Sequence, residues 1–444
     1  MAMTNSVSGD GAPGREPPAR REVNDAPALS SPTHPGAGPL RGGGALSAFG
    51  YRDFSLLWSG ALLSNIGTWV HMSALFWYVK EITGSDAWVG LVTVANFIPV
   101  FFFVLFAGSL ADVLNRKALI IATQAAMMLG ALALGVLASL ETAGLAEILA
   151  ITAFMGIAFT FNFPAWRAII TDLVRPGDIL NAVALDAAEF NLARFIGPWL
   201  GGIIVSAWTV AAAFYTNAAS YLAVIAALLL IRTETPRNPK PPQGTLGHMR
   251  EILGYVRRNR WALNLLVVLA VASVFGLPVI VLLPGMARDV LAEGARGYGL
   301  LLGFVGLGAA VSAPFVTWMN RRYRESEIIK ITALVSGAAL AGFSLSRAFW
   351  LSLALSFALG AAFLMLSAAV NTVLQARVER NMRGRIMSLY ILVFQGMMPV
   401  GGMLMGFLAD RYSAPSVLLV GGLACLAMSL ALFAFPSFLR EANT

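Results

Sequence analysis

The first feature of this sequence that could do chemistry is a group of ionisable side chains inside an apolar stretch, residues 182–206. Asp186, Glu189 and Arg194 lie there. Charged groups are costly inside a bilayer, so those that occur there commonly mark the path of an ion, a proton or a substrate. A buried carboxylate that can lose its cation partner can bind a proton. The pattern indicates a proton-coupling site made of these three residues.

Helix geometry gives each acid one advantage as the partner of Arg194. At about 100° per residue, Asp186 is about 80° from Arg194 around the helix but about two turns away along the axis. Glu189 is nearer along the axis but about 140° away around it. Long helical side chains lean toward the N-terminus, so Arg194 would reach back toward both acids. We place Asp186 slightly ahead of Glu189; the alternative is that both acids stay solvated at the headgroup level.

A second group lies in the polar segment after residue 110. Gly108 would permit close approach of another helix, and Asp112 is an acid at the membrane interface. An acid there can cap the positive N-terminus of another helix, such as the one that begins near Gly384 and Arg385. That contact would hold two helix ends together in one state and be lost in another. The alternative, an ordinary interfacial acid, stays open.

Further polar and aromatic residues of the apolar stretches could line a substrate site. Small polar side chains also form hydrogen bonds between helices, and for each amide taken singly we favour that structural role. The candidates for substrate binding are Asn65, Asn162, Asn191, Arg194, Asn371, Tyr390, Phe394 and Gln395.

The elements that position these groups follow from composition. Of the 444 residues 58% are hydrophobic and 12% are charged, about half the charge of a soluble domain. Apolar stretches close to the ~20 residues of a membrane span recur twelve times, six on each side of a polar segment. We predict an all-α membrane protein with twelve transmembrane helices in two six-helix bundles. Its predicted parts are a disordered cytoplasmic tail (1–48), the first bundle (49–231), a cytoplasmic linker (232–260), the second bundle (261–437) and a C-terminal tail (438–444).

The two halves carry weak internal repeats. Pro198, Gly201 and Gly202 in the first half correspond to Pro399, Gly401 and Gly402 in the second, and residues 115–117 resemble residues 320–322. A duplicated six-helix unit is an arrangement in which substrate binds between the halves near the middle of the bilayer.

Charge placement predicts orientation and excludes other classes of protein. With both termini on one side of the membrane, that side receives 25 of the 31 lysines and arginines. Because basic residues favour the cytoplasmic side, we expect both termini in the cytoplasm. The basic residues are spread over many loops, so we expect no nucleic-acid partner. With one cysteine, Cys425, and three histidines we expect no disulfide, metal site or cofactor, and no catalytic constellation indicates an enzyme.

From Phe54 to about Ala434 the sequence resembles the major facilitator superfamily, and more narrowly its drug and siderophore exporters, proton antiporters with twelve spans. The segments that carry this resemblance are residues 108–117, 164–174, 191–198, 282–284 with 299–301, and 383–388.

The resemblance implies a pseudo-twofold helical bundle that exports a small amphipathic molecule and is driven by the proton gradient. It implies a gating role for Asp112 with Arg116, and a structural or coupling role for Arg194 beside Asn191. The sequence departs from several drug antiporters of the superfamily because no acid is embedded in its first span. That departure places more weight on Asp186 and Glu189.

We therefore expect a multidrug-type exporter of the cytoplasmic membrane, working by alternating access. Its expected partners are a small-molecule substrate, protons and the lipid bilayer, and we expect a monomer. The alternatives are a dedicated siderophore or metabolite exporter and, from another class, a non-transporting receptor or assembly factor on a transporter scaffold.

Overall fold

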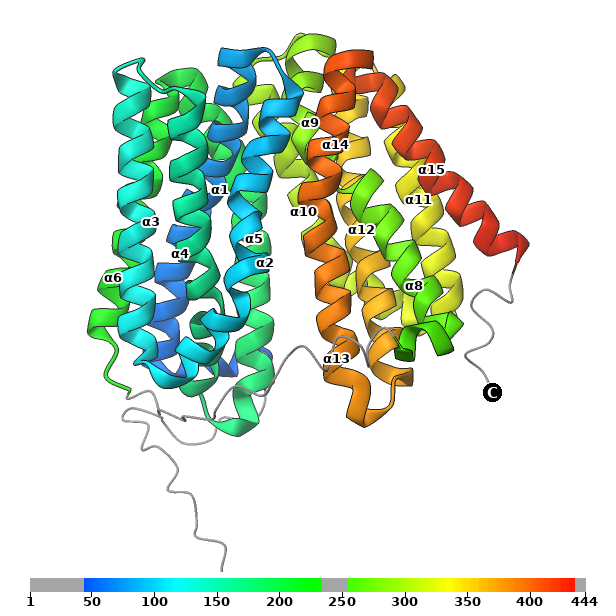
Figure 1. The fold of residues 1–444 in the computed structure, drawn as a ribbon. Coiled ribbons are helices and arrows are strands. Elements are labelled where there is room, and N and C mark those ends of the chain that lie inside the picture. The colour runs from blue at the N-terminus through cyan, green and yellow to red at the C-terminus, as the bar shows by residue number, and fades with distance from the viewer. Residues whose placement is uncertain (1–43, 234–253, 436–444) are drawn as a thin grey trace, which may run out of the picture. The chain divides into compact units, whose positions relative to one another are not determined.

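The computed structural model describes residues 44–233 and 254–435, nearly all of them helical (Figure 1). Most of the predicted N-terminal tail, the middle of the predicted linker and the predicted C-terminal tail lie outside these residues, so the domain boundaries remain predictions. The helices form two bundles, α1–α6 and α8–α15 (Figure 1).

The first bundle contains six long helices and two short 3₁₀ segments. They are η1 (Ser47–Gly50), α1 (Arg52–Thr83), α2 (Asp86–Val113), α3 (Arg116–Ser139), α4 (Leu145–Asp172), η2 (Pro176–Asp178), α5 (Ile179–Ala207) and α6 (Val210–Leu230).

The second bundle contains helices that continue into one another through π-helical turns. They are α8 (Arg260–Val271), η3 (Ala272–Gly276), α9 (Val279–Gly285), η4 (Met286–Val290), α10 (Ala295–Asn320), α11 (Glu325–Leu345), α12 (Phe349–Arg377), α13 (Arg380–Ile391), η5 (Leu392–Gly396), α14 (Met397–Tyr412) and α15 (Ala414–Ala434).

Eleven segments of the described chain are long and apolar enough to cross a membrane. The segments Arg260–Val290 and Met382–Tyr412 are each long and apolar enough as one continuous segment, despite their π-helical turns. The remaining long helix, α1, has 32 residues but a lower mean hydropathy, because polar residues such as Asn65, Thr68 and His71 recur in it. The predicted all-α, two-bundle membrane fold is confirmed, while α1 as the twelfth span remains a prediction.

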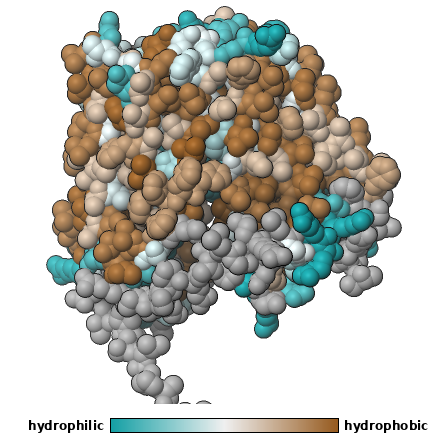
Figure 2. Space-filling view, in the orientation of Figure 1, coloured by the Kyte–Doolittle hydropathy of each residue, from teal (hydrophilic) through white to brown (hydrophobic). Residues whose placement is uncertain are grey.

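Apolar side chains dominate the face of the protein seen in Figure 2, where hydrophilic residues gather toward the upper edge and the lower right. Helices that present such a surface are suited to contact with lipid.

Each of the repeated glycine pairs contacts both its own bundle and the other one. A Cβ on Gly201 would lie 2.4 Å from Ser73 Oγ of α1, in its own bundle, whereas one on Gly202 would lie 2.5 Å from the carbonyl oxygen of Ala295 of α10, in the other bundle. A Cβ on Gly401 would likewise lie 2.5 Å from the carbonyl oxygen of Val274 in its own bundle.

The backbone of the second glycine of the α14 pair also contacts the other bundle, although a Cβ on Gly402 would lie 3.0 Å from Val281 of its own bundle. The carbonyl oxygen of Gly402 lies 2.7 Å from where a Cβ on Gly90 of α2 would be. In each half the first glycine of the repeat packs within its own bundle, and the backbone at the second glycine contacts the other bundle.

The bundles contact each other along antiparallel helix pairs. The close contacts of these pairs lie toward one end of the molecule. In the α2–α14 pair, a Cβ on Gly406 would lie 2.5 Å from the carbonyl oxygen of Asp86. At the end of η5, just before α14, a Cβ on Gly396 would lie 2.7 Å from the ring of Phe101 of α2. We call the end that contains Lys80 and Asp86 the Lys80 end, and the opposite end, with Asp112 and the start of α13, the Asp112 end.

At the Asp112 end the same two helices are apart. Gly108 follows Gly90 by 18 residues, about five full turns, so both glycines face the same side of α2. A Cβ on Gly108 would meet nothing within 4 Å, and neither would one on Gly384 of α13. The close approach predicted at Gly108 is therefore absent in this conformation.

This asymmetry predicts opposite outcomes for one substitution at two positions. We expect Gly90→Val to lower the free energy of unfolding by about 1–3 kcal/mol, because the added methyls meet the backbone of Gly402. Gly108→Val, the matched control on the same face, should be nearly neutral. Thermal unfolding of the purified protein measures both, and equal destabilisation would contradict the described contact.

Candidate functional site

Glu189 is the most deeply buried acid of the predicted coupling site. Its side chain lies between α5 and α1, where the residue is 1% exposed. Asn65 Nδ2 donates to both carboxylate oxygens at 3.0 Å. Among the described residues, no lysine or arginine forms an ion pair with Glu189. The charged form of this carboxylate is therefore stabilised mainly by a neutral amide.

Asp186, one turn earlier on α5, has a different environment. Arg167 Nη1 of α4 lies 3.2 Å from its carboxylate, and Trp166 Nε1 donates to the other oxygen at 3.1 Å. A cation from a neighbouring helix therefore neutralises Asp186. The two acids considered together in the sequence are separated by the structure into one paired and one unpaired carboxylate.

The prediction that Arg194 is paired with these acids is wrong. Its guanidinium carbon lies 5.6 Å from the centre of the Trp69 ring of α1, and within the described chain it forms no ion pair with Asp186 or Glu189. A cation over an aromatic face is stabilised by the ring quadrupole. Neither contact could be seen from α5 alone, because Trp69 and Arg167 belong to other helices.

Arg194 also lies at an inter-bundle contact. A Cβ on Gly306 of α10 would lie 2.4 Å from its carbonyl oxygen. The α5–α10 contact thus extends from Gly202 at the Lys80 end to Arg194 in the middle of α5. Arg194 is the charged residue that α5 contributes to this contact, and it lies far from both ends of that helix.

Two predicted substrate ligands have structural partners in the first bundle. Asn162 Nδ2 donates to Thr123 Oγ1 of α3 at 2.8 Å, and both side chains are buried. Asn191 Nδ2 donates to the carbonyl oxygen of Ala187 in its own helix, also at 2.8 Å. These geometries match the structural alternative for both amides.

The candidates of the second bundle include an aromatic stack. The rings of Tyr390 and Phe394 are 5.9 Å apart and nearly parallel, and Phe363 stacks on Phe394 at 5.7 Å. The hydroxyl group of Ser367 lies 2.6 Å from that of Tyr390.

The remaining two candidates are Asn371 and Gln395. Asn371 Oδ1 accepts a hydrogen bond from the side chain of Gln375, one turn later on α12, and Gln395 is exposed. The second bundle therefore contributes aromatic and neutral polar candidates for substrate binding, whereas the charged one, Arg194, belongs to the first.

The predicted gating contact is not formed in this conformation. Asp112 is exposed, and within residues 44–233 and 254–435 its carboxylate forms no hydrogen bond or ion pair. Arg116, at the start of α3, pairs with Asp172 at the end of α4, a contact inside the first bundle. Arg385 is partly buried, and its Nη1 lies 3.7 Å from Met382 Sδ.

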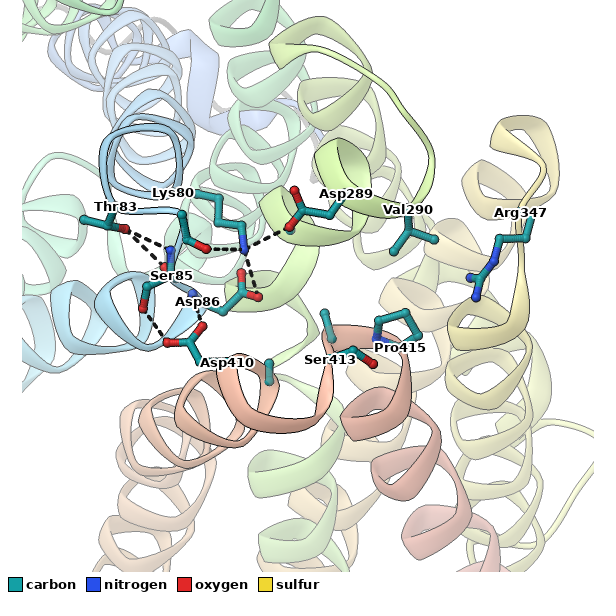
Figure 3. Close-up of a pocket in the computed structure, with 14 residues that line it drawn as sticks. Lys80, Thr83, Ser85, Asp86, Asp289, Val290, Arg347, Asp410, Ser413 and Pro415 are labelled. Atoms are coloured by element: carbon teal, nitrogen blue, oxygen red, sulfur yellow. Dashed lines mark hydrogen bonds and ion pairs between the residues drawn. The ribbon is translucent and has the colours of Figure 1, made fainter.

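Sequence analysis missed a polar cluster at the Lys80 end that joins the bundles. The Lys80 side chain is 4% exposed, and its Nζ lies 3.1 Å from Asp86 of α2 and 3.0 Å from Asp289 of η4 (Figure 3). Lys80 and Asp86 belong to the first bundle and Asp289 to the second. Arg288 adds a second link, because its Nη1 donates to the carbonyl oxygen of Lys80 at 3.3 Å.

Asp410 forms the other part of this cluster. It lies in the last turn of α14 and accepts hydrogen bonds from the backbone N–H groups of Asp86 at 2.7 Å and Ala87 at 3.3 Å, and from Ser85 Oγ (Figure 3). These are donors of the first turn of α2, so an acid of one bundle caps a helix of the other. The cluster lines a pocket of about 540 Å³.

A sequence signal for Asp410 exists. Residues 406–410 read G-F-L-A-D and residues 108–112 read G-S-L-A-D, identical at four of five positions. The two copies are 298 residues apart, whereas the repeats that relate the halves are separated by 201 to 205. A search for repeats between the halves therefore does not find this pair.

The Asn65–Glu189 contact predicts a measurable coupling energy. Asn65→Leu should destabilise the protein by about 1–3 kcal/mol, because Glu189 is left buried without its donor. The same substitution in a Glu189→Leu background should cost clearly less. Asn191→Leu is the matched control, since its amide bonds its own helix. Melting temperatures of the four combinations measure this, and additive effects would contradict it.

Comparison with known proteins agrees with this architecture. The chain is 27% identical to the multidrug resistance protein MdtG of Citrobacter koseri, over 80% of this chain and 87% of that protein. It is 20% identical to the staphyloferrin A transporter of Staphylococcus aureus, over 84% of this chain and 94% of that protein.

Solved structures share the fold. The nucleoside transporter NupG matches with a TM-score of 0.74 at 12% identity, over 88% of this chain and all of that one. A bacterial homologue of the human lysosomal transporter Spinster, described as inward-facing and unoccupied, matches with a TM-score of 0.67 at 15% identity, over 88% of this chain and 97% of that one.

The family described as transmembrane secretion effector matches residues 43–443, almost the whole chain. The chain belongs to this transmembrane secretion effector family and is a membrane transporter of the major facilitator superfamily.

Proposed function

We propose that the protein is a proton-coupled secondary exporter of small amphipathic molecules that works by alternating access. The observation that carries this proposal is Glu189, a buried acid held by a neutral amide near the middle of a membrane helix. The similarity to multidrug resistance proteins supports export. The contact of the bundles at only one end supports alternating access.

The proposed orientation places both termini in the cytoplasm of the cell and the protein in its cytoplasmic membrane. It follows from the 25 of 31 basic residues on the side of the termini. The Asp112 end is then cytoplasmic and the Lys80 end is external. In this orientation the described conformation is closed toward the outside.

Glu189 suits proton binding better than Asp186, which the sequence analysis placed slightly ahead. Protonation of Asp186 would break its ion pair with Arg167, at 3.2 Å in this structure, so binding a proton there works against an existing charge interaction. Glu189 can gain or lose a proton without breaking an ion pair. Asn65 can follow either state, because its amide offers both a donor and an acceptor.

The remaining site residues have proposed roles in substrate binding and gating. Asn65 and Arg194 of the first bundle, and Asn371, Tyr390, Phe394 and Gln395 of the second, would bind substrate between the bundles. Asp112 and Arg385, with Gly108 and Arg116, would act at the cytoplasmic end in the opposite conformation.

Proton coupling is tested with the protein in inverted vesicles that carry an imposed proton gradient. Glu189→Gln should reduce gradient-driven substrate uptake to the rate seen with a protonophore, because the amide cannot carry a proton. Asp186→Asn, the matched amide substitution one turn away, should slow uptake but keep its dependence on the gradient. Uptake by Glu189→Gln that still follows the gradient would rule out Glu189 as the carrier.

A dedicated siderophore exporter is the second candidate function. The similarity to the staphyloferrin A transporter favours it, and Arg167 and Arg194 could bind the carboxylates of an anionic chelator. The aromatic stack of the second bundle favours instead a flat or apolar substrate, since aromatic faces bind such groups and organic cations.

A substrate panel separates these functions. Cationic aromatic dyes should be transported, and Tyr390→Ala or Phe394→Ala should weaken dye transport about two- to tenfold in apparent affinity. Phe407→Ala is the control, because Phe407 is an exposed aromatic residue of α14. Transport of polycarboxylate chelators without dyes would favour the siderophore exporter. No flux of any compound would favour a receptor or assembly factor.

A further inference from the structure

The α2–α14 pair places the C-terminal end of each helix beside the N-terminal end of its partner. At the Lys80 end, Asp86 begins α2 and Gly406 lies in the last turns of α14, in backbone contact. At the Asp112 end, Asp112 lies in the last turn of α2, and the continuous segment that contains α14 begins with α13. The first N–H groups of a helix lack partners within it, so an acid there is stabilising.

At the Lys80 end an acid caps the start of α2 in this way. Asp410 accepts from two N–H groups of the first turn of α2 and from the hydroxyl of Ser85. Ser85 itself is the N-terminal cap of α2, because its side chain accepts from the N–H of Trp88. The start of α2 is therefore capped twice, by its own serine and by an aspartate of the other bundle.

The close backbone approach and the acid belong to the same short motif. In G-F-L-A-D, Gly406 allows contact with the backbone of Asp86, and Asp410, one turn later, reaches the N–H groups. The motif G-S-L-A-D repeats both residues as Gly108 and Asp112 at the end of α2. There Gly108 faces open space and Asp112 is exposed.

We propose that the two G-x-L-A-D motifs are reciprocal latches of the transport cycle, and that Asp410 is the latch that closes the Lys80 end. In the described conformation the Asp410 latch is closed and the Asp112 latch is open. Movement to the opposite conformation breaks the contacts of Asp410 and lets Gly108 and Asp112 contact α13. This inference rests on the alternating access of the proposed function.

The ion pair between Lys80 and Asp289 strengthens the same latch. It joins α1 to η4 at 3.0 Å. Lys80 also pairs with the carboxylate of Asp86, and the backbone N–H group of Asp86 donates a hydrogen bond to Asp410. The cap and the ion pair thus lie side by side and must separate together when the Lys80 end opens.

Opening of the Lys80 end can be measured without substrate or a proton gradient. Thr93 of α2 is 0% exposed, and its methyl group lies 4.0 Å from where a Cβ on Gly402 would be. In a Cys425→Ser background, Thr93→Cys should react with a hydrophilic maleimide only when α2 and α14 separate. The reaction rate in lipid nanodiscs therefore reports opening whatever the protein transports.

We expect Asp410→Asn to raise the labelling rate about fivefold, the effect of weakening one helix cap. Asp289→Asn should also raise it, by loss of the ion pair with Lys80. The control is Glu81→Gln, which makes the same change of charge at the same end on an exposed residue and should leave the rate unchanged. Adding Asp112→Asn to Asp410→Asn should return the rate toward that of the parent, because both latches are then weakened.

Unchanged labelling in folded Asp410→Asn and Asp289→Asn proteins would overturn the proposal. A double variant that labels as fast as Asp410→Asn alone would overturn the reciprocity of the latches. These outcomes are distinct from failure of the proposed function, which would be seen as absence of gradient-driven flux while the labelling rates still respond to the substitutions.

Discussion

Close backbone contact between the two bundles is the constraint on which the rest of this structure depends. In lipid, apolar side chains give helices little reason to associate, so association relies on small residues and polar contacts. This protein supplies both at the Lys80 end, where Gly90, Gly202 and Gly406 bring backbones together and Asp410 caps α2. A contact with so few polar links suits the opening and closing that the proposed alternating access requires.

The buried charges are arranged around the place where this contact stops. Arg194 lies in the middle of α5, at the inner end of the α5–α10 contact, and is held by Trp69, so its charge needs no acid. Asp186 is paired with Arg167. Among the described residues Glu189, unlike Asp186, has no ion-pair partner and accepts hydrogen bonds from the neutral amide of Asn65. A proton can therefore bind there without disturbing an ion pair, one turn and a half from the inter-bundle contact at Arg194.

The fold was predictable from sequence, because hydropathy and charge placement act along the chain. The partners of Arg194 and Asp186 were not, since Trp69 and Arg167 come from other helices and the geometry of α5 contains no information about them. The Pro198–Gly202 repeat indicated the duplication correctly. Asp410 was missed because its relation to Asp112 follows the antiparallel pairing of α2 with α14, which is not the symmetry that relates the halves.

Paired distance measurements on the two ends test the central claim most directly. Spin labels at Glu81 and Arg411 would report the Lys80 end, and labels at Val113 and Arg383 the Asp112 end; all four residues are exposed. In a Cys425→Ser protein reconstituted in lipid, the account predicts two populations at each pair, with opposite responses to pH and to Asp410→Asn: when one end closes, the other opens. Distances that change at both ends in the same direction, or at neither, would contradict it.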